Sequence, residues 1–133
     1  MDLFIVPRKA QIDESKGDRA IRSVASILKA AHLARSWEQI NNTPKQSIYY
    51  SVVFDNEWFD SRLVLDLNAF LVYSVGIDMF SLFRVNGEGE VSYQPRVFNS
   101  SLKLNPDIKS QPLPFNHKTI TFEKILGGWL YFD

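Results

Sequence analysis

The stretch IYYSVVFDNEWFDSRLVLDL, residues Ile48–Leu67, decides the fold that we predict for this chain. Over residues 48–55 and again over residues 62–67, the side chains at even positions differ in character from those at odd positions. This period of two is that of a β-strand with one buried face. The link Asn56–Asp60 between them is short enough for a hairpin loop. We therefore predict an antiparallel pair of strands here, and β-structure for most of the chain that follows.

The end of the first strand and this link carry a cluster that suggests a binding site, which we call the acidic link. It contains Asp55, Glu57 and Asp60 around two aromatic residues, Trp58 and Phe59. Aromatic anchors inside a charged rim are typical of protein-binding hot spots. We predict that these five residues contact another protein that has a basic surface. A plain solvated loop and a Mg²⁺ or Ca²⁺ site remain the alternatives.

Upstream, residues 18–34 show the period of an amphipathic α-helix. Asp18 is suited to cap the first turn, because its carboxylate can accept hydrogen bonds from free N–H groups. The expected core face consists of Ala20, Ile21, Val24, Ile27, Leu28 and Ala31. Arg19, Arg22 and Lys29 lie away from this face, where they form either a solvated surface or a candidate phosphate-binding site.

The helical pattern changes at Ser36. Ser36 and Gln39 have the spacing of a capping box, which predicts a bend or a new helix that ends within residues 41–44. The alternative is one straight helix that exposes Leu33 and Trp37 as a docking patch.

Further strands are expected on both sides of these segments. Leu3–Val6 is a short strand that Pro7 ends or places at an edge. Residues 69–75 and 79–85 are two more strands, with a single buried helix capped by Asn68 as the alternative.

The C-terminal part of the chain is expected to continue the sheet. A tight turn at Asn86–Gly89 leads into a strand from Glu90 that Pro95 ends or places at an edge. Residues 105–118 form a surface connection, and residues 118–122 and 129–132 form a last pair of strands around Gly127 and Gly128.

Together these elements predict a single α+β domain over residues 1–133. One N-terminal amphipathic helix, which bends or restarts near Ser36, packs on a mostly antiparallel sheet of about five to seven strands. The length of 133 residues is enough for one hydrophobic core.

Composition excludes several classes of function. The chain has no Cys, so disulfides and thiolate chemistry are absent. Fifteen basic residues offset fifteen acidic ones, whereas dedicated nucleic-acid binders are usually more basic. No glycine-rich nucleotide fingerprint is present, and His32 and His117 do not form a zinc-type pair. We expect no cofactor and no bound metal.

We therefore predict a small, non-catalytic protein of the inhibitor, immunity or accessory-subunit type that binds another macromolecule. The alternative is a nucleic-acid-associated protein or metal-dependent nuclease that uses the basic helix face and the carboxylates Asp55, Glu57 and Asp60. The chain shows no signal peptide and no apolar run long enough to cross a membrane, so we expect a cytoplasmic protein without a membrane partner. The sequence does not indicate an oligomeric state.

Overall fold

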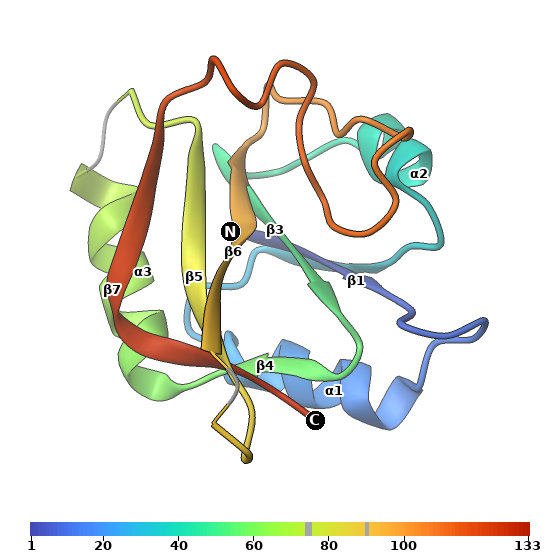
Figure 1. The fold of residues 1–133 in the computed structure, drawn as a ribbon, viewed down its shortest axis with the longest axis vertical. Coiled ribbons are helices and arrows are strands. Elements are labelled where there is room, and N and C mark those ends of the chain that lie inside the picture. The colour runs from blue at the N-terminus through green and yellow to red at the C-terminus, as the bar shows by residue number, and fades with distance from the viewer. Residues whose placement is uncertain (74–75, 90) are drawn as a thin grey trace.

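A curled sheet with helices on both faces forms the body of the molecule (Figure 1). The computed structural model describes residues 1–73, 76–89 and 91–133. In chain order the described elements are β1 (Asp2–Val6), α1 (Glu14–Ser23), β2 (Ala30–Leu33), α2 (Trp37–Asn42), β3 (Tyr49–Phe54), β4 (Glu57–Phe59), α3 (Ser61–Tyr73), β5 (Met79–Val85), β6 (Val91–Asn99) and β7 (Phe122–Phe132). The α+β class and the predicted range of strand numbers are confirmed.

The seven described strands are ordered β2-β1-β3-β6-β5-β7-β4. Antiparallel pairing joins β3 to β6, β6 to β5 and β7 to β4, as the prediction of an antiparallel-rich sheet requires. However, β1 runs parallel to both of its neighbours, and β7 runs parallel to β5. The prediction did not contain these parallel pairs.

The position of β4 shows how strongly the sheet curls. Only Asp55 and Asn56 separate β3 from β4, yet β4 pairs with β7 at the far end of the strand order. The last strand of the sheet therefore returns to the end of β3. Figure 1 shows β4 at the same end of the molecule as α1, which it contacts.

Two apolar clusters pack on opposite faces of the sheet. Leu3 and Ile5 belong to the first cluster, which α1 and α3 cover. Phe4 and Tyr50 belong to the second cluster, which α2 and the segment 102–120 cover. Neighbouring residues of β1 enter different clusters because side chains alternate across a strand.

The predicted helix 18–34 is corrected at both ends. α1 begins four residues earlier because Asp13, rather than Asp18, is its N-cap and accepts hydrogen bonds from backbone N–H groups of the first turn. It ends at Ser23, and Ala30–Leu33 pairs with β1 instead. This pairing gives hydrogen-bond partners to a backbone edge of β1 that would otherwise lack them. Ala20 and Val24, both on the predicted core face, are fully buried.

A second helix does begin after Ser36, as predicted. The hydroxyl of Ser36 accepts a hydrogen bond from the backbone N–H of Gln39 at 3.1 Å. Trp37 is 8% exposed, whereas Leu33 is 47% exposed. Trp37 therefore does not form an exposed docking patch with Leu33, and that alternative is wrong.

The predicted strand 62–67 is helical, because α3 spans Ser61–Tyr73. The alternation was misleading, since Leu63, Val64 and Leu67 also lie on one face of a helix and are the buried residues of α3. The predicted strand 69–75 is wrong for its first five residues, and residues 74 and 75 lie outside the described residues. The alternative of a single buried helix is right only for residues 69–73, because α3 starts at Ser61 and ends at Tyr73. Residues 79–85 form β5, so the strand predicted there is confirmed.

The C-terminal prediction is confirmed in part. β5 and β6 form the predicted hairpin, although Glu90 lies outside the described residues. Residues 122–132 form one strand rather than a pair. Gly128 has φ +68°, and a Cβ there would lie 2.2 Å from the backbone nitrogen of Leu63. Only glycine allows this approach of β7 to α3.

Pro95 neither ends its strand nor lies at an edge, because β6 lies between β3 and β5. Phe80 pairs with Val97, but Ser81 pairs with Pro95, so Arg96 is the extra residue of a β-bulge. A proline is tolerated inside a sheet at such a position. This bulge determines where the side chain of Arg96 lies.

Candidate functional site

Most residues of the acidic link lie inside the molecule. Glu57, Phe59 and Asp55 have 0%, 3% and 5% of their surface exposed. The carboxylate of Asp55 accepts hydrogen bonds from the backbone N–H groups of Arg8 at 3.2 Å and Asp13 at 2.8 Å. It therefore holds the loop between β1 and α1. The prediction that Asp55, Glu57 and Phe59 contact a partner protein is corrected, because these side chains are not on the surface.

Asp60 also has a structural role, as the residue before α3. Its Oδ1 accepts a hydrogen bond from the backbone N–H of Leu63 at 2.7 Å, which caps the helix. Its Oδ2 accepts a hydrogen bond from the backbone N–H of Trp129 at 3.0 Å. Asp60 therefore connects α3 to β7.

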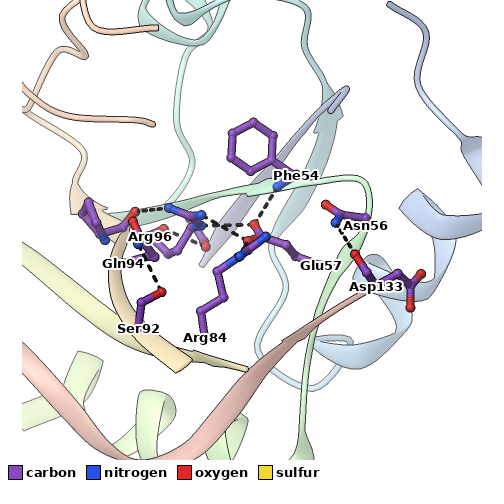
Figure 2. Close-up of polar contacts among 10 residues, drawn as sticks. Phe54, Asn56, Glu57, Arg84, Ser92, Gln94, Arg96 and Asp133 are labelled. Atoms are coloured by element: carbon purple, nitrogen blue, oxygen red, sulfur yellow. Dashed lines mark hydrogen bonds and ion pairs between the residues drawn. The ribbon is translucent and has the colours of Figure 1, made fainter. Parts of the chain in front are cut away.

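Glu57 is the centre of a buried ionic group that we call the Glu57 triad: Glu57, Arg84 and Arg96. One carboxylate oxygen accepts hydrogen bonds from Nε of Arg96 at 3.1 Å and from the backbone N–H of Phe54 at 2.8 Å. The other accepts from Nη2 of Arg96 at 3.1 Å and from Nε of Arg84. Figure 2 shows both guanidinium groups directed at the one carboxylate.

The environment of Glu57 keeps it ionised. Burial by itself raises the pKa of its carboxyl group. The charge and hydrogen bonds of Arg96, together with the bonds from Phe54 and Arg84, outweigh burial and hold this pKa below its ordinary value. The triad therefore contains one negative and two positive charges.

The triad has an unbalanced positive charge next to open space. The side chains of Arg96 and Arg84 are 3% and 15% exposed, and Glu57 is the one described carboxylate within ion-pair distance of either. Within the described part of the chain, the terminal nitrogens of Arg84 have no hydrogen-bond acceptor. The guanidinium group of Arg84 also lies over the ring of Phe132, with its carbon 3.4 Å from the ring centroid. One carboxylate thus faces two guanidinium groups, and this net positive charge favours an anion beside Arg84.

A polar cavity of about 600 Å³ opens above the triad. Its lining is rich in donors and consists of Pro7, Arg8, Phe54, Arg84, Gln94, Arg96, Lys109, Ser110 and Gln111. Arg8 and Lys109 are exposed at its mouth, so they add positive charge there without being buried. We call this cavity the polar compartment.

A second cavity, of about 380 Å³, adjoins the first, and we call it the apolar compartment. It is lined by Val6, Pro7, Arg35, Ser36, Trp37, Glu38, Phe54, Pro106 and Lys109. Pro7, Phe54 and Lys109 line both cavities, so the two lie side by side, and we call them together the cleft. Both volumes lie within the range of about 300–1,000 Å³ that is usual for ligand sites.

Hydrogen bonds hold the wall of the cleft opposite β1. The indole N–H of Trp37 donates to the carbonyl oxygen of Ile108 at 2.7 Å. The side chain of Asn41 donates to the carbonyl of Leu104 and accepts from its N–H, at 2.8 and 2.7 Å. These bonds connect α2 to the segment that carries Lys109, so the cleft is formed before a ligand binds.

The predicted phosphate-binding residues are not brought together in one site. Arg19 lies over the ring of Trp58, with its guanidinium carbon 3.7 Å from the ring centroid, and it pairs with Asp133 at 2.9 Å. Arg22 is exposed near the end of α1, and Lys29 follows the helix rather than lying on it. The helical face that was expected to align these three residues does not extend to Lys29.

The metal-site alternative finds little support in the described residues. Among them, no three His, Asp or Glu side chains are placed to hold a metal ion together. The carboxylates of the acidic link bond to backbone N–H groups and to arginines instead. None of the described helices combines the length and apolarity needed to cross a membrane.

Compared with known proteins, the chain matches no family model and no curated protein sequence. The functional argument therefore depends on the geometry and charge of the cleft.

Sequence reasoning missed the residues that form the cleft. Arg84 stands in the mostly apolar run Phe80–Val85, in which Ser81 is the other polar residue, and Arg96 follows Pro95 in another strand. An arginine within an apolar strand must find a buried acidic partner, and Glu57 was available in the same part of the chain. That signal was present in the sequence, whereas the contributions of Arg8 and Lys109 depend on tertiary structure.

Proposed function

We propose that this chain is a non-catalytic, cytoplasmic protein that binds an acidic segment of a partner protein in the cleft above the Glu57 triad. The class is the one expected from the sequence: an inhibitor, an immunity protein or an accessory subunit. The charge of the expected partner is reversed, because the acidic link is buried and the open cleft is basic.

The observation that carries the proposal is the unbalanced charge of the triad. Two guanidinium groups share the carboxylate of Glu57, and both arginines line the polar compartment. A guanidinium group offers paired donors that match the two oxygens of a carboxylate. An Asp or Glu side chain of a partner would supply the missing negative charge.

The charge around the triad supports the same conclusion. Five cationic side chains line the described compartments, whereas Glu38 is the one carboxylate among the lining residues. Such a concentration of one sign of charge increases the rate at which an oppositely charged partner finds the site.

A second candidate is binding of single-stranded nucleic acid beside Arg19. What favours it is the set of rings on β4 and β7: Trp58 stacks on Tyr131, and Trp129 meets Tyr131 edge to face. Such rings can stack on bases. Against it, the charge of Arg19 is already paired with Asp133.

The proposal is tested by selecting a random heptapeptide library on the immobilised protein. We expect the selected peptides to be rich in Asp and Glu. Arg84→Gln removes the unbalanced charge but leaves Glu57 its two bonds from Arg96, so this variant should fold and bind the selected peptides about tenfold or more weakly. Arg62→Gln removes the same charge from the exposed start of α3 and should bind them like the wild type.

Two outcomes would contradict the proposal. Peptides without acidic residues, or equal binding by Arg84→Gln, would show that the triad does not recognise an anion. Nucleic-acid binding would be favoured instead if a labelled oligo-dT binds the wild type and Arg84→Gln equally well but binds Arg19→Gln more weakly.

A further inference from the structure

The cleft has a second, chemically different half, and this half restricts what the acidic segment can be. We infer that the segment carries an apolar side chain directly beside its acidic residue, so that the apolar side chain fills the apolar compartment while the carboxylate meets Arg84. This inference rests on the proposed function and specifies its ligand.

The apolar compartment is built to take a hydrophobic group. Val6 and Trp37 are 3% and 8% exposed, so they lie beneath its surface as part of the second apolar cluster. Phe54, Pro7 and Pro106 complete the apolar part of the lining. An apolar group placed there leaves water and contacts several side chains, which is favourable in proportion to the area buried.

The indole nitrogen of Trp37, the buried polar group of this lining, already has a hydrogen-bond partner. The indole N–H of Trp37 donates to the carbonyl of Ile108, and so it does not require a partner from the ligand. The charged side chains of Arg35 and Glu38 are exposed at the rim, where water can solvate them. An apolar ligand group can therefore enter the compartment without leaving a buried donor unpaired.

The shared residues place the two halves next to each other. Phe54 lies between the apolar compartment and the triad: it lines both cavities, and its backbone N–H donates a hydrogen bond to Glu57. The guanidinium carbon of Arg96 lies 5.4 Å from the centroid of this ring. Because Pro7, Phe54 and Lys109 are shared by the two linings, the halves adjoin and neighbouring groups of one ligand can occupy both.

Lys109 marks the other shared edge of the cleft and adds to this selectivity. It is exposed and lines both compartments, so it can pair with a backbone carbonyl or with a second carboxylate of a bound segment. A small inorganic anion would use the polar half alone and would leave the apolar half filled with water. The combined cleft therefore favours an amphiphilic acidic segment over a free anion.

The test uses four capped tetrapeptides: Gly-Phe-Glu-Gly, Gly-Ala-Glu-Gly, Gly-Phe-Gln-Gly and Gly-Ala-Gln-Gly. Each is titrated into the isotopically labelled protein, and its dissociation constant is measured from NMR chemical shifts. The same series with the two central residues exchanged covers the opposite chain direction. Inorganic phosphate and acetate are titrated as free anions.

We expect the Phe-Glu peptide, in one of its two directions, to bind about tenfold or more tightly than both the Ala-Glu and the Phe-Gln peptides. In Arg84→Gln the preference for Glu over Gln should be lost, whereas the preference for Phe over Ala should remain. Arg62→Gln should keep both preferences.

The outcomes separate this inference from the proposed function. Equal binding of the Phe-Glu and Ala-Glu peptides, with Glu still preferred over Gln, would overturn the inference and leave the proposed function intact. Phosphate or acetate binding as tightly as the Phe-Glu peptide would also overturn the inference. Loss of the preference for Glu in the wild type would overturn the proposed function itself.

Discussion

Replacing Glu57 by glutamine is the most informative single change to the stability of this fold. The carboxylate is fully buried and accepts four hydrogen bonds, of which three come from the guanidinium groups of Arg84 and Arg96. The glutamine side chain has nearly the same shape as the one it replaces. Its amide NH₂ would, however, face the N–H donors that now bond to one of the two carboxylate oxygens. The substitution would also leave the positive charges of Arg84 and Arg96 without a counter-charge.

The size of the effect follows from this loss. Removing one partner of a buried ion pair costs about 3–5 kcal/mol, because an uncompensated charge remains. Domains of this size unfold with a free energy of about 5–15 kcal/mol, so Glu57→Gln removes a large fraction of the total. We expect the melting temperature to fall by about 10–20 °C.

The assay is urea unfolding followed by circular dichroism. Glu123→Gln is the matched control, because Glu123 is exposed on β7, and it should change the free energy of unfolding by less than about 0.5 kcal/mol. Phosphate or sulfate in the buffer should stabilise the Glu57 variant more than the wild type, since an anion can replace the missing carboxylate. A cost below about 1 kcal/mol for Glu57→Gln would refute the description of the triad as a tightly coupled buried group.

Three further predictions concern pH and packing. The pKa of Glu57 is lowered in the folded state, so its contribution to stability is fully present above its ordinary pKa of 4.5 and is lost as the pH falls from there through the lowered pKa. In acid unfolding curves, the stability difference between the wild type and Glu57→Gln should therefore narrow below pH 4.5. Gly128→Ala should cost about 1–3 kcal/mol or more in urea unfolding, because φ is +68° and Leu63 blocks the Cβ, whereas Gly87→Ala meets open space and should be nearly neutral. Leu63→Ala should lower the free energy of unfolding by about 2–5 kcal/mol, because Leu63 is fully buried. Leu65→Ala should lower it by less than about 0.5 kcal/mol, because Leu65 is 70% exposed. Equal losses would mean that α3 is rotated about its axis.

The sequence predicted the parts of the fold that local chemistry determines. The capping residue Ser36 located the start of α2, and the turn at Asn86–Gly89 located the β5–β6 hairpin. These signals are reliable because a cap or a tight turn is set by the backbone of a few neighbouring residues.

Long-range pairing caused the main errors. The segment Ala30–Leu33 has helical periodicity, but its parallel pairing with β1 outweighs that local preference. The run 62–67 fits both a strand and a helix, and only the packing of Leu63 and Leu67 against the core distinguishes them.

The candidate site illustrates the same limit. The sequence analysis chose the acidic link as the binding site, but a buried carboxylate and an exposed one are identical in sequence. Burial of Glu57 depends on the curl that returns β4 to the end of β3, and on the bulge that directs Arg96 toward it. Both features come from the whole sheet, so the charge of the binding surface could not be derived from the link alone.

The most direct test of the cleft as an anion site is an NMR titration that observes the arginine side chains. The Nε–H and Nη signals of Arg84 and Arg96 are followed while the Gly-Phe-Glu-Gly peptide is added to the wild-type protein. We expect the signals of Arg84 to move most, those of Arg96 to move less, and those of Arg19 and Arg22 on α1 to stay in place. Unchanged Arg84 signals at a peptide concentration that shifts Arg19 or Arg22 would contradict the assignment of binding to the Glu57 triad.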